Sequence, residues 1–134
     1  MDLLVNLDVP DLRRAEMLYR EAFGLHVGRR FGASVVELTG LPVRLYLLHK
    51  AAGSVGAGHM RRDYTRHWCP VHLDVVVEDF DAALARAENA GFVREGPVRD
   101  EAFGRIVQLA DPFGHGWCLL AFSARGYDAV ATSG

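Results

Sequence analysis

One arrangement occurs twice in this sequence: an alternating apolar segment, an aspartate, and an amphipathic helical pattern that ends at a glycine. In the first copy, apolar and polar side chains alternate over residues 3–9, and Asp11 precedes the helical pattern. The second copy begins 68 residues later, with residues 71–77 and Asp79 in the equivalent places. Alternation predicts a half-buried strand, and the aspartates are suited to cap the N-termini of the two helices. The chain is therefore predicted to fold as two similar units.

Each copy is followed by three further short strands, so each half is predicted to run strand, helix, strand, strand, strand. We divide the chain into repeat 1 (about 3–49), a linking loop (about 50–68), repeat 2 (about 69–122) and a tail (123–134) that is expected to fray. The predicted strands after the helices span 26–30, 33–38 and 43–49 in repeat 1 and 92–95, 105–110 and 116–122 in repeat 2.

The composition is that of one globular domain without unusual bias. The 134 residues include 15 basic and 17 acidic side chains, and the resulting net charge of −2 argues against a general nucleic-acid binder. No apolar run approaches the roughly 20 residues of a membrane span, and the first residues lack the pattern of a secretion signal. The two cysteines provide no disulfide framework. We therefore expect a cytoplasmic protein that binds neither nucleic acid nor membranes.

Five short segments together carry a resemblance to a known family: Val9-Pro10-Asp11-Leu12, Phe23-Gly24-Leu25, Asp79-Phe80-Asp81-Ala82-Ala83, Ala90-Gly91-Phe92 and Asp111-Pro112-Phe113-Gly114-His115. In order and spacing they resemble the vicinal oxygen chelate superfamily of glyoxalases, bleomycin-resistance proteins and extradiol dioxygenases. The resemblance implies an α+β fold in which two βαβββ units pair their sheets into a curved, incomplete barrel with the helices outside. It also implies a small-molecule ligand in the concavity and a homodimer.

The resemblance further implies four positions for the ligands of a divalent metal. In this sequence they fall on Leu4, Tyr46, His72 and Cys118. Leucine cannot bind a metal, and the carboxylate that metal-dependent relatives place late in a unit has become Cys118. We therefore expect no metal and no other cofactor.

Strand parity selects further candidates. Asn6, His72 and Asp74 alternate with the apolar side chains of their strands and are expected to face the cavity. An imidazole two residues from a carboxylate can act as an acid–base pair, so His72 and Asp74 are the predicted catalytic residues. The alternative is that His72 is a hydrogen-bonded wall residue.

Other candidates keep two interpretations each. Glu37 and Gln108 occupy equivalent places in the two repeats and face either the cavity or, as alternation favours, the solvent. Aromatic side chains line a pocket or belong to the core, and Cys118 is a nucleophile or inert packing. The predicted ligand-binding residues are Asn6, Glu37, Tyr46, His72, Phe103, Gln108, Phe113 and Cys118.

The sequence therefore predicts a metal-free protein that binds a small organic molecule, such as an antibiotic or a metabolite. Two alternatives stay open. The first is a metal-dependent lyase, isomerase or dioxygenase, in which Glu37, Asp74 or Gln108 joins His72 as a ligand. The second is a metal-free enzyme that uses His72 and Asp74 as an acid–base pair. Whether the chain is an enzyme is left open.

Overall fold

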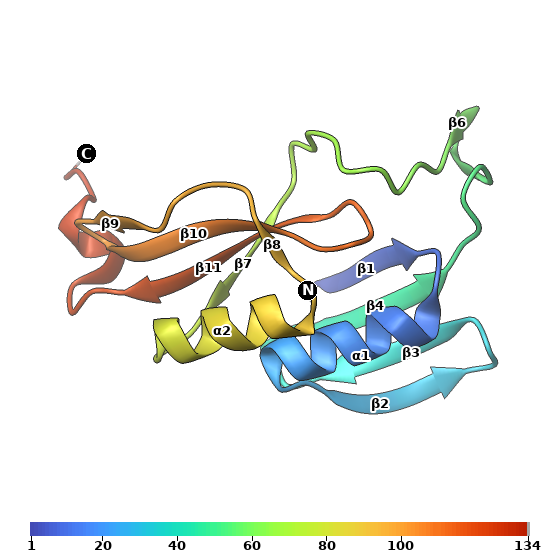
Figure 1. Ribbon diagram of the computed structural model, residues 1–134, viewed down its shortest axis with the longest axis horizontal. Helices are drawn as coiled ribbons and strands as arrows, with labels where there is room; N and C mark the ends of the chain where they lie inside the picture. The colour runs from blue at the N-terminus through green and yellow to red at the C-terminus, as the bar shows by residue number, and fades with distance from the viewer. Residues whose placement is uncertain (134) are drawn as a thin grey trace. The chain divides into compact units, whose positions relative to one another are not determined.

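A computed structural model describes residues 1–133, and the chain divides into two compact units, Met1–Thr65 and a second unit that begins at Arg66 (Figure 1). The first unit contains β1 (Leu4–Val9), α1 (Leu12–Phe23), β2 (His26–Phe31), β3 (Val35–Thr39), β4 (Arg44–His49), β5 (Val55–Ala57) and β6 (Met60–Arg61). The second contains β7 (Leu73–Val76), α2 (Phe80–Ala90), β8 (Val93–Arg94), β9 (Arg99–Glu101), β10 (Gly104–Ala110), β11 (Gly116–Phe122) and the 3₁₀ helix η1 (Gly126–Ala129).

The first unit is a four-stranded sheet with one helix on one face. Its strand order is β1-β4-β3-β2, with β1 parallel to β4 and the other neighbours antiparallel. Helix α1 lies against β3 and β4. Its N-terminus is capped by Asp11, whose carboxylate accepts a hydrogen bond from the backbone of Arg14 at 3.0 Å, and it ends at Gly24 in the left-handed conformation. The core consists of Val9, Ala15, Leu18, Tyr19, Ala22, Val36, Leu38, Leu45 and Leu47.

The second unit repeats this plan. Its strand order is β7-β11-β10-β8, β9 pairs with β10, and β7 is again parallel to its neighbour β11. Helix α2 packs on β11, and the Asp79 side chain caps it through the backbone of Ala82 at 3.1 Å. The predicted α+β class, the two βαβββ repeats and both aspartate caps are confirmed. Neither helix of the described chain has the length and apolar character that a membrane crossing requires.

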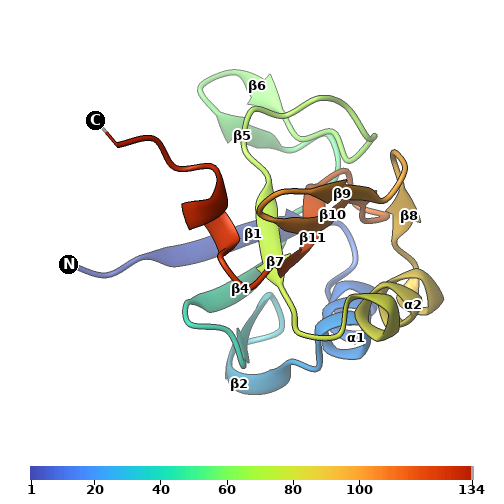
Figure 2. The same cartoon turned by 90° about the vertical axis from the view of Figure 1, so that its left-hand side faces the viewer.

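The predicted linking loop contains structure that the sequence did not indicate. Strands β5 and β6 form a hairpin, drawn in green in Figure 2. Arg62 holds the chain that follows the hairpin, because its Nε lies 2.6 Å from Oδ2 of Asp8 in β1. The sequence pattern did not predict this hairpin within the linking loop. Its short strands are exposed, so they lack the apolar alternation on which the prediction relied.

Three further differences from the prediction concern β7, β9 and the tail. Strand β7 begins at Leu73 rather than at residue 71, and Val71, just after Pro70, is 68% exposed. Strand β9 was missed because its residues are all exposed. The tail does not simply fray: η1 places the ring of Tyr127 4.8 Å from that of Phe122, centroid to centroid. The last predicted tail residue, 134, lies outside the described residues.

The turn between β10 and β11 is organised by one buried carboxylate. Asp111 is 5% exposed, and its Oδ1 accepts hydrogen bonds from the backbone of Phe113 and His115 at 2.8 and 3.0 Å. Its Oδ2 accepts one from Nε1 of Trp117 at 3.0 Å and lies 2.8 Å from Nδ1 of His115. The buried carboxylate of Asp111 therefore organises this turn and also fixes Trp117 in the core.

Replacing Asp111 tests how much its carboxylate contributes to the stability of the fold. We expect Asp111→Ala to lower the free energy of unfolding by about 3 kcal/mol, because it leaves several buried donors without an acceptor. The helix-cap variant Asp79→Ala is the control, with an expected loss of about 1 kcal/mol. Urea denaturation measures both, and equal losses would show that Asp111 is only an ordinary turn residue.

Candidate functional site

The predicted site residues fall into two groups, one in each unit, at equivalent places in the sheets. In the first unit, Asn6 of β1 lies opposite Tyr46 of β4, which lies opposite Glu37 of β3. In the second unit, the matching row is Asp74 of β7, Cys118 of β11 and Gln108 of β10. Each row lies on the sheet face opposite the helix, since the alternating residues of the same strands form the core beneath it.

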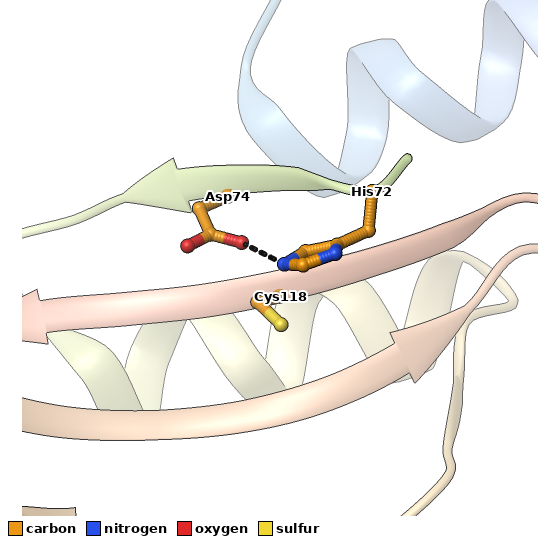
Figure 3. A group of neighbouring side chains, drawn as sticks. All are labelled: His72, Asp74 and Cys118. Atoms are coloured by element: carbon orange, nitrogen blue, oxygen red, sulfur yellow. Dashed lines mark ion pairs between the residues drawn. The ribbon is translucent and has the colours of Figure 1, made fainter. Parts of the chain in front are cut away.

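The group in the second unit brings three chemically active side chains together (Figure 3). Nε2 of His72 lies 3.3 Å from Oδ1 of Asp74, and the ligand atoms of His72, Asp74 and Cys118 all lie within 4.8 Å of one another. The His72 and Asp74 side chains are 57% and 30% exposed, whereas Cys118 is buried. The pair can therefore meet a ligand from solvent, with the thiol beneath it.

The environment of Cys118 keeps its thiol protonated. Burial raises the pKa of Cys118 to about 11, and the nearby Asp74 carboxylate adds to the effect. A thiol is a weak nucleophile compared with its thiolate. The interpretation of Cys118 as packing is therefore favoured over the nucleophile in the ligand-free chain.

Two other predicted residues belong to the same face of the second unit. Phe103 packs, partly exposed, against the buried cluster of Ile106, Cys118 and Leu120. Gln108 is exposed and opposite Cys118 in the register. Phe113, in contrast, is 2% exposed and belongs to the turn around Asp111, so it offers no exposed ring at a pocket rim.

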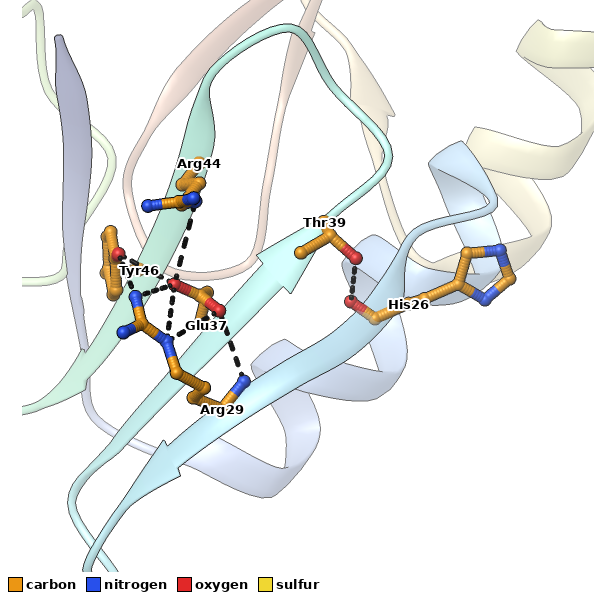
Figure 4. Close-up of polar contacts among 6 residues, drawn as sticks. All are labelled: His26, Arg29, Glu37, Thr39, Arg44 and Tyr46. Atoms are coloured by element: carbon orange, nitrogen blue, oxygen red, sulfur yellow. Dashed lines mark hydrogen bonds and ion pairs between the residues drawn. The ribbon is translucent and has the colours of Figure 1, made fainter. Parts of the chain in front are cut away.

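The group in the first unit is an ion cluster around Glu37 (Figure 4). Glu37 is 4% exposed, so the expectation that alternation turns it to solvent was wrong. Its carboxylate accepts hydrogen bonds from the backbone N–H, Nε and Nη2 of Arg29 and, at 2.7 Å, from the hydroxyl of Tyr46. Nε of Arg44 lies 4.0 Å away. Bonding to Arg29, then to Tyr46, lowers the pKa of Glu37 to about 2.

Sequence reasoning missed the two arginines of this cluster. Arg44 shares strand parity with Tyr46, so its face was available from the alternation of β4. Arg29 was not, because β2 has a register shift between Val27 and Arg30, and a bulge of this kind re-aims side chains without a clear sequence signal.

Two of the four positions that the resemblance implies for metal ligands lie in the first unit, and two lie in the second. Leu4 carries no donor and is 49% exposed, and the phenol of Tyr46 is engaged by Glu37. In the second unit, His72, Asp74 and Cys118 provide one nitrogen, one oxygen and one sulfur donor. No other group of three such donors comes as close within residues 1–133. This set fits a borderline divalent ion such as Zn²⁺, provided that Cys118 loses its proton on binding.

Comparison with known proteins gives a family model and several relatives. The model described as a glyoxalase-like domain matches residues 4–120. An uncharacterized protein of Mycobacterium bovis is 43% identical over 51 residues, which are 37% of this chain and 34% of that protein. An uncharacterized protein of Mycobacterium tuberculosis strain H37Rv matches equally well over 30% of its length. The match thus spans about a third of these curated relatives.

Solved structures share the fold at low sequence identity. The fosfomycin resistance protein FosX of Mesorhizobium loti has a TM-score of 0.70 at 14% identity, covering 96% of both chains. Lactoylglutathione lyase of Agrobacterium tumefaciens has a TM-score of 0.62 at 20% identity, covering 90% of this chain and 92% of its own. FosX of Listeria monocytogenes, solved as a mutant with Mn(II) and a dihydroxypropylphosphonic acid, has a TM-score of 0.67 at 15% identity and covers 91% and 90%. At these identities the likeness shows the fold.

The two cysteines should differ sharply in reactivity. At pH 8 we expect iodoacetamide to alkylate the exposed Cys69 and to leave Cys118 unmodified, because burial and a raised pKa keep Cys118 a thiol. Intact-mass spectrometry counts the labels. Cys69→Ser should take up none in the native state, Cys118→Ser should take up one, and unfolding in urea should expose both cysteines of the wild type. Rapid double labelling of the native protein would contradict the buried thiol.

Glu37 should leave a signature in acid. Because its folded pKa is about 2 against an ordinary value of 4.5, its contribution to stability is complete above pH 4.5 and disappears as the pH falls towards 2. We expect Glu37→Gln to lack this part of the pH dependence and to be less stable at neutral pH. Urea denaturation between pH 2 and 7 measures both effects. Glu21→Gln on α1 controls for the loss of one charge, and parallel wild-type and Glu37→Gln curves would contradict the cluster.

Proposed function

Because the chain belongs to the glyoxalase-like domain family, we propose that it binds a small organic molecule on the sheet face of its second unit that lies opposite α2, without a resident metal. The observation that carries the proposal is the exposed His72–Asp74 pair above the buried Cys118 thiol. The imidazole can donate or accept a hydrogen bond, and the carboxylate can accept one, so the pair suits a ligand with hydroxyl, amide or carbonyl groups.

The surroundings of the pair support this proposal. Phe103 is partly exposed and packs on the apolar cluster of Ile106 and Leu120, and Gln108 adds an exposed amide. Small-molecule sites are mostly apolar with a few polar anchors, which is the composition of this face. The ligand is therefore expected to combine an apolar body with a polar edge.

Two features favour the metal-free interpretation. In the first unit, the positions that hold metal ligands in related proteins carry Leu4 and a Tyr46 hydroxyl that is already bonded to Glu37. In the second unit, Cys118 is held as a thiol, whereas metals bind the thiolate.

The second candidate function is metal-dependent catalysis. It is favoured by the close approach of the His72, Asp74 and Cys118 donors and by the Mn(II) in the structure of FosX of Listeria monocytogenes. These three residues would hold the ion and leave a position open for substrate. A bound divalent ion would supply a Lewis acid that polarises oxygens of the substrate.

The same histidine and aspartate also support proton transfer without a metal. A side chain that moves a proton must lie within hydrogen-bond reach of the reacting atom, and the exposure of His72 makes that possible. Turnover of a bound compound that is abolished in His72→Ala, with the fold intact, would identify an enzyme. Unchanged ligand after saturable binding would identify a binding protein.

Metal content separates the two candidates. We expect protein purified without chelators or affinity metal to contain well under one equivalent of Zn, Ni, Mn or Fe by elemental analysis, and to stay so after incubation with metal and desalting. Near-stoichiometric metal that is absent from His72→Ala would contradict the metal-free proposal.

Cobalt(II) gives the same test an optical readout. Binding through Cys118 would produce a thiolate-to-cobalt absorption band in the near ultraviolet, and Cys118→Ser would lack it. The metal-free proposal predicts no such band in the wild type. Cys69→Ser is the matched control, since it removes the exposed cysteine and leaves the site intact.

A further inference from the structure

A second binding site is suggested by the first unit. We propose that the sheet face opposite α1 binds an anionic group, a carboxylate or a phosphoryl group on a molecule with an apolar body, between Arg29 and Arg44. All of the residues that form this site belong to the unit Met1–Thr65. The inference therefore stands independently of the function proposed for His72 and Asp74.

Arg29 is held in place by other side chains of the same unit, without any ligand. Glu37 Oε1 accepts from the Arg29 backbone N–H at 3.2 Å and from its Nε at 3.1 Å, and Oε2 accepts from Nη2. Nη2 also donates to the hydroxyl of Tyr46 at 3.2 Å. A guanidinium fixed by a buried carboxylate loses less conformational freedom when it binds a second anion.

The backbone of β2 has the shape that the bonds between Arg29 and Glu37 require. Gly28 and Arg29 both lie opposite Glu37, where the β2–β3 register shifts. The bulge releases the Arg29 N–H from the strand ladder, and the Glu37 side chain accepts it. A Cβ atom at residue 28 would lie 2.5 Å from Glu37 Oε1, so a side chain there would displace the carboxylate from the position in which Arg29 and Tyr46 hold it. The glycine at position 28, the bulge in β2 and the Glu37 carboxylate thus depend on one another.

The sheet face around Glu37 carries an excess of positive charge. Two guanidinium groups, Arg29 and Arg44, face one carboxylate, Glu37, and both arginine side chains are 59% exposed. Arg44 approaches Glu37 only to 4.0 Å and has no other polar partner among residues 1–133. The bonds of Arg29 use Nε and Nη2 and leave Nη1 available. Guanidinium groups bind carboxylate and phosphate oxygens through paired N–H donors.

Exposed apolar side chains flank the guanidinium groups of Arg29 and Arg44. Phe31 is 46% exposed, and the centroid of its ring lies 6.3 Å from that of Tyr46. Cζ of Arg29 lies 5.3 Å from the centroid of the Phe31 ring. Leu4 is 49% exposed and lies opposite Arg44 in the β1–β4 register. Exposed apolar side chains next to cationic donors match an anion that carries an aromatic or aliphatic body.

Benzoate is the probe, and benzamide is its neutral counterpart of the same shape. Amide chemical shifts in two-dimensional NMR titrations give the dissociation constants and report on the fold. We expect benzoate to shift residues of β2, β3 and β4, and Arg44→Ala to weaken its binding about tenfold through loss of charge-assisted hydrogen bonds. Benzamide should bind about tenfold more weakly than benzoate for the same reason.

Arg30→Ala is the matched control. Arg30 lies next to Arg29 on β2 and is 54% exposed, but its guanidinium pairs with Glu16 of α1 at 2.9 Å. The variant removes the same charge from the other face, so its affinity for benzoate should equal that of the wild type. Inorganic phosphate should displace benzoate from the wild type, because both anions bind the same pair of guanidinium groups.

A further variant guards against loss of the fold. Arg29→Ala leaves the buried Glu37 without its main partner and is expected to unfold, so Arg29→Lys, which keeps the charge and loses the paired donors, is used instead. Its benzoate affinity should fall while the amide spectrum stays native. Equal binding of benzoate by wild type and Arg44→Ala, or equal binding of benzoate and benzamide, would overturn the inference. So would a loss of benzoate binding in His72→Ala that Arg44→Ala does not share, since the anion would then be bound by the second unit.

Discussion

In each unit, the parallel pairing of the first strand with the last strand of the main sheet determines which polar side chains meet. Because β1 runs parallel to β4 and β7 parallel to β11, a residue in the opening strand, at the edge of the sheet, pairs with a residue 40 or more positions later in the neighbouring inner strand. That pairing brings Asp74 to Cys118 and Asn6 to Tyr46. The helix of each unit packs on the opposite face and leaves these rows uncovered by it. The reactive groups therefore depend on strand register more than on any loop.

The two rows have the same geometry and different chemistry. In the second unit, the centre of the row is a neutral thiol beneath an exposed imidazole and carboxylate. In the first, the centre of the row is the phenol of Tyr46, whose hydroxyl donates to the buried carboxylate of Glu37 beside it, and Arg29 neutralises that carboxylate. The row in the second unit is suited to hydrogen bonding or metal binding. The row in the first unit, with Arg29 and Arg44 beside it, is suited to attracting an anion. The same fold therefore presents two rows of side chains with different chemistry.

Local rules predicted most of the fold and only part of the site. Capping aspartates, terminal glycines and alternation are short-range signals, so helices α1 and α2 and the long strands were predictable. The β5–β6 hairpin was not, since it is tethered through Arg62 and Asp8, which are 54 positions apart. The burial of Glu37 was missed because alternation does not reveal a bulge on the neighbouring strand. The homodimer and the incomplete barrel stay predictions.

The bulge at Gly28 has a consequence for how this sequence can change over time. A side chain at position 28 collides with the carboxylate of Glu37, and Glu37 in turn is tolerated only while Arg29 neutralises it. The order of substitutions is therefore constrained: residue 28 can acquire a side chain only after position 37 has lost its acid. Relatives that carry a side chain at position 28 should therefore lack an acidic residue at position 37.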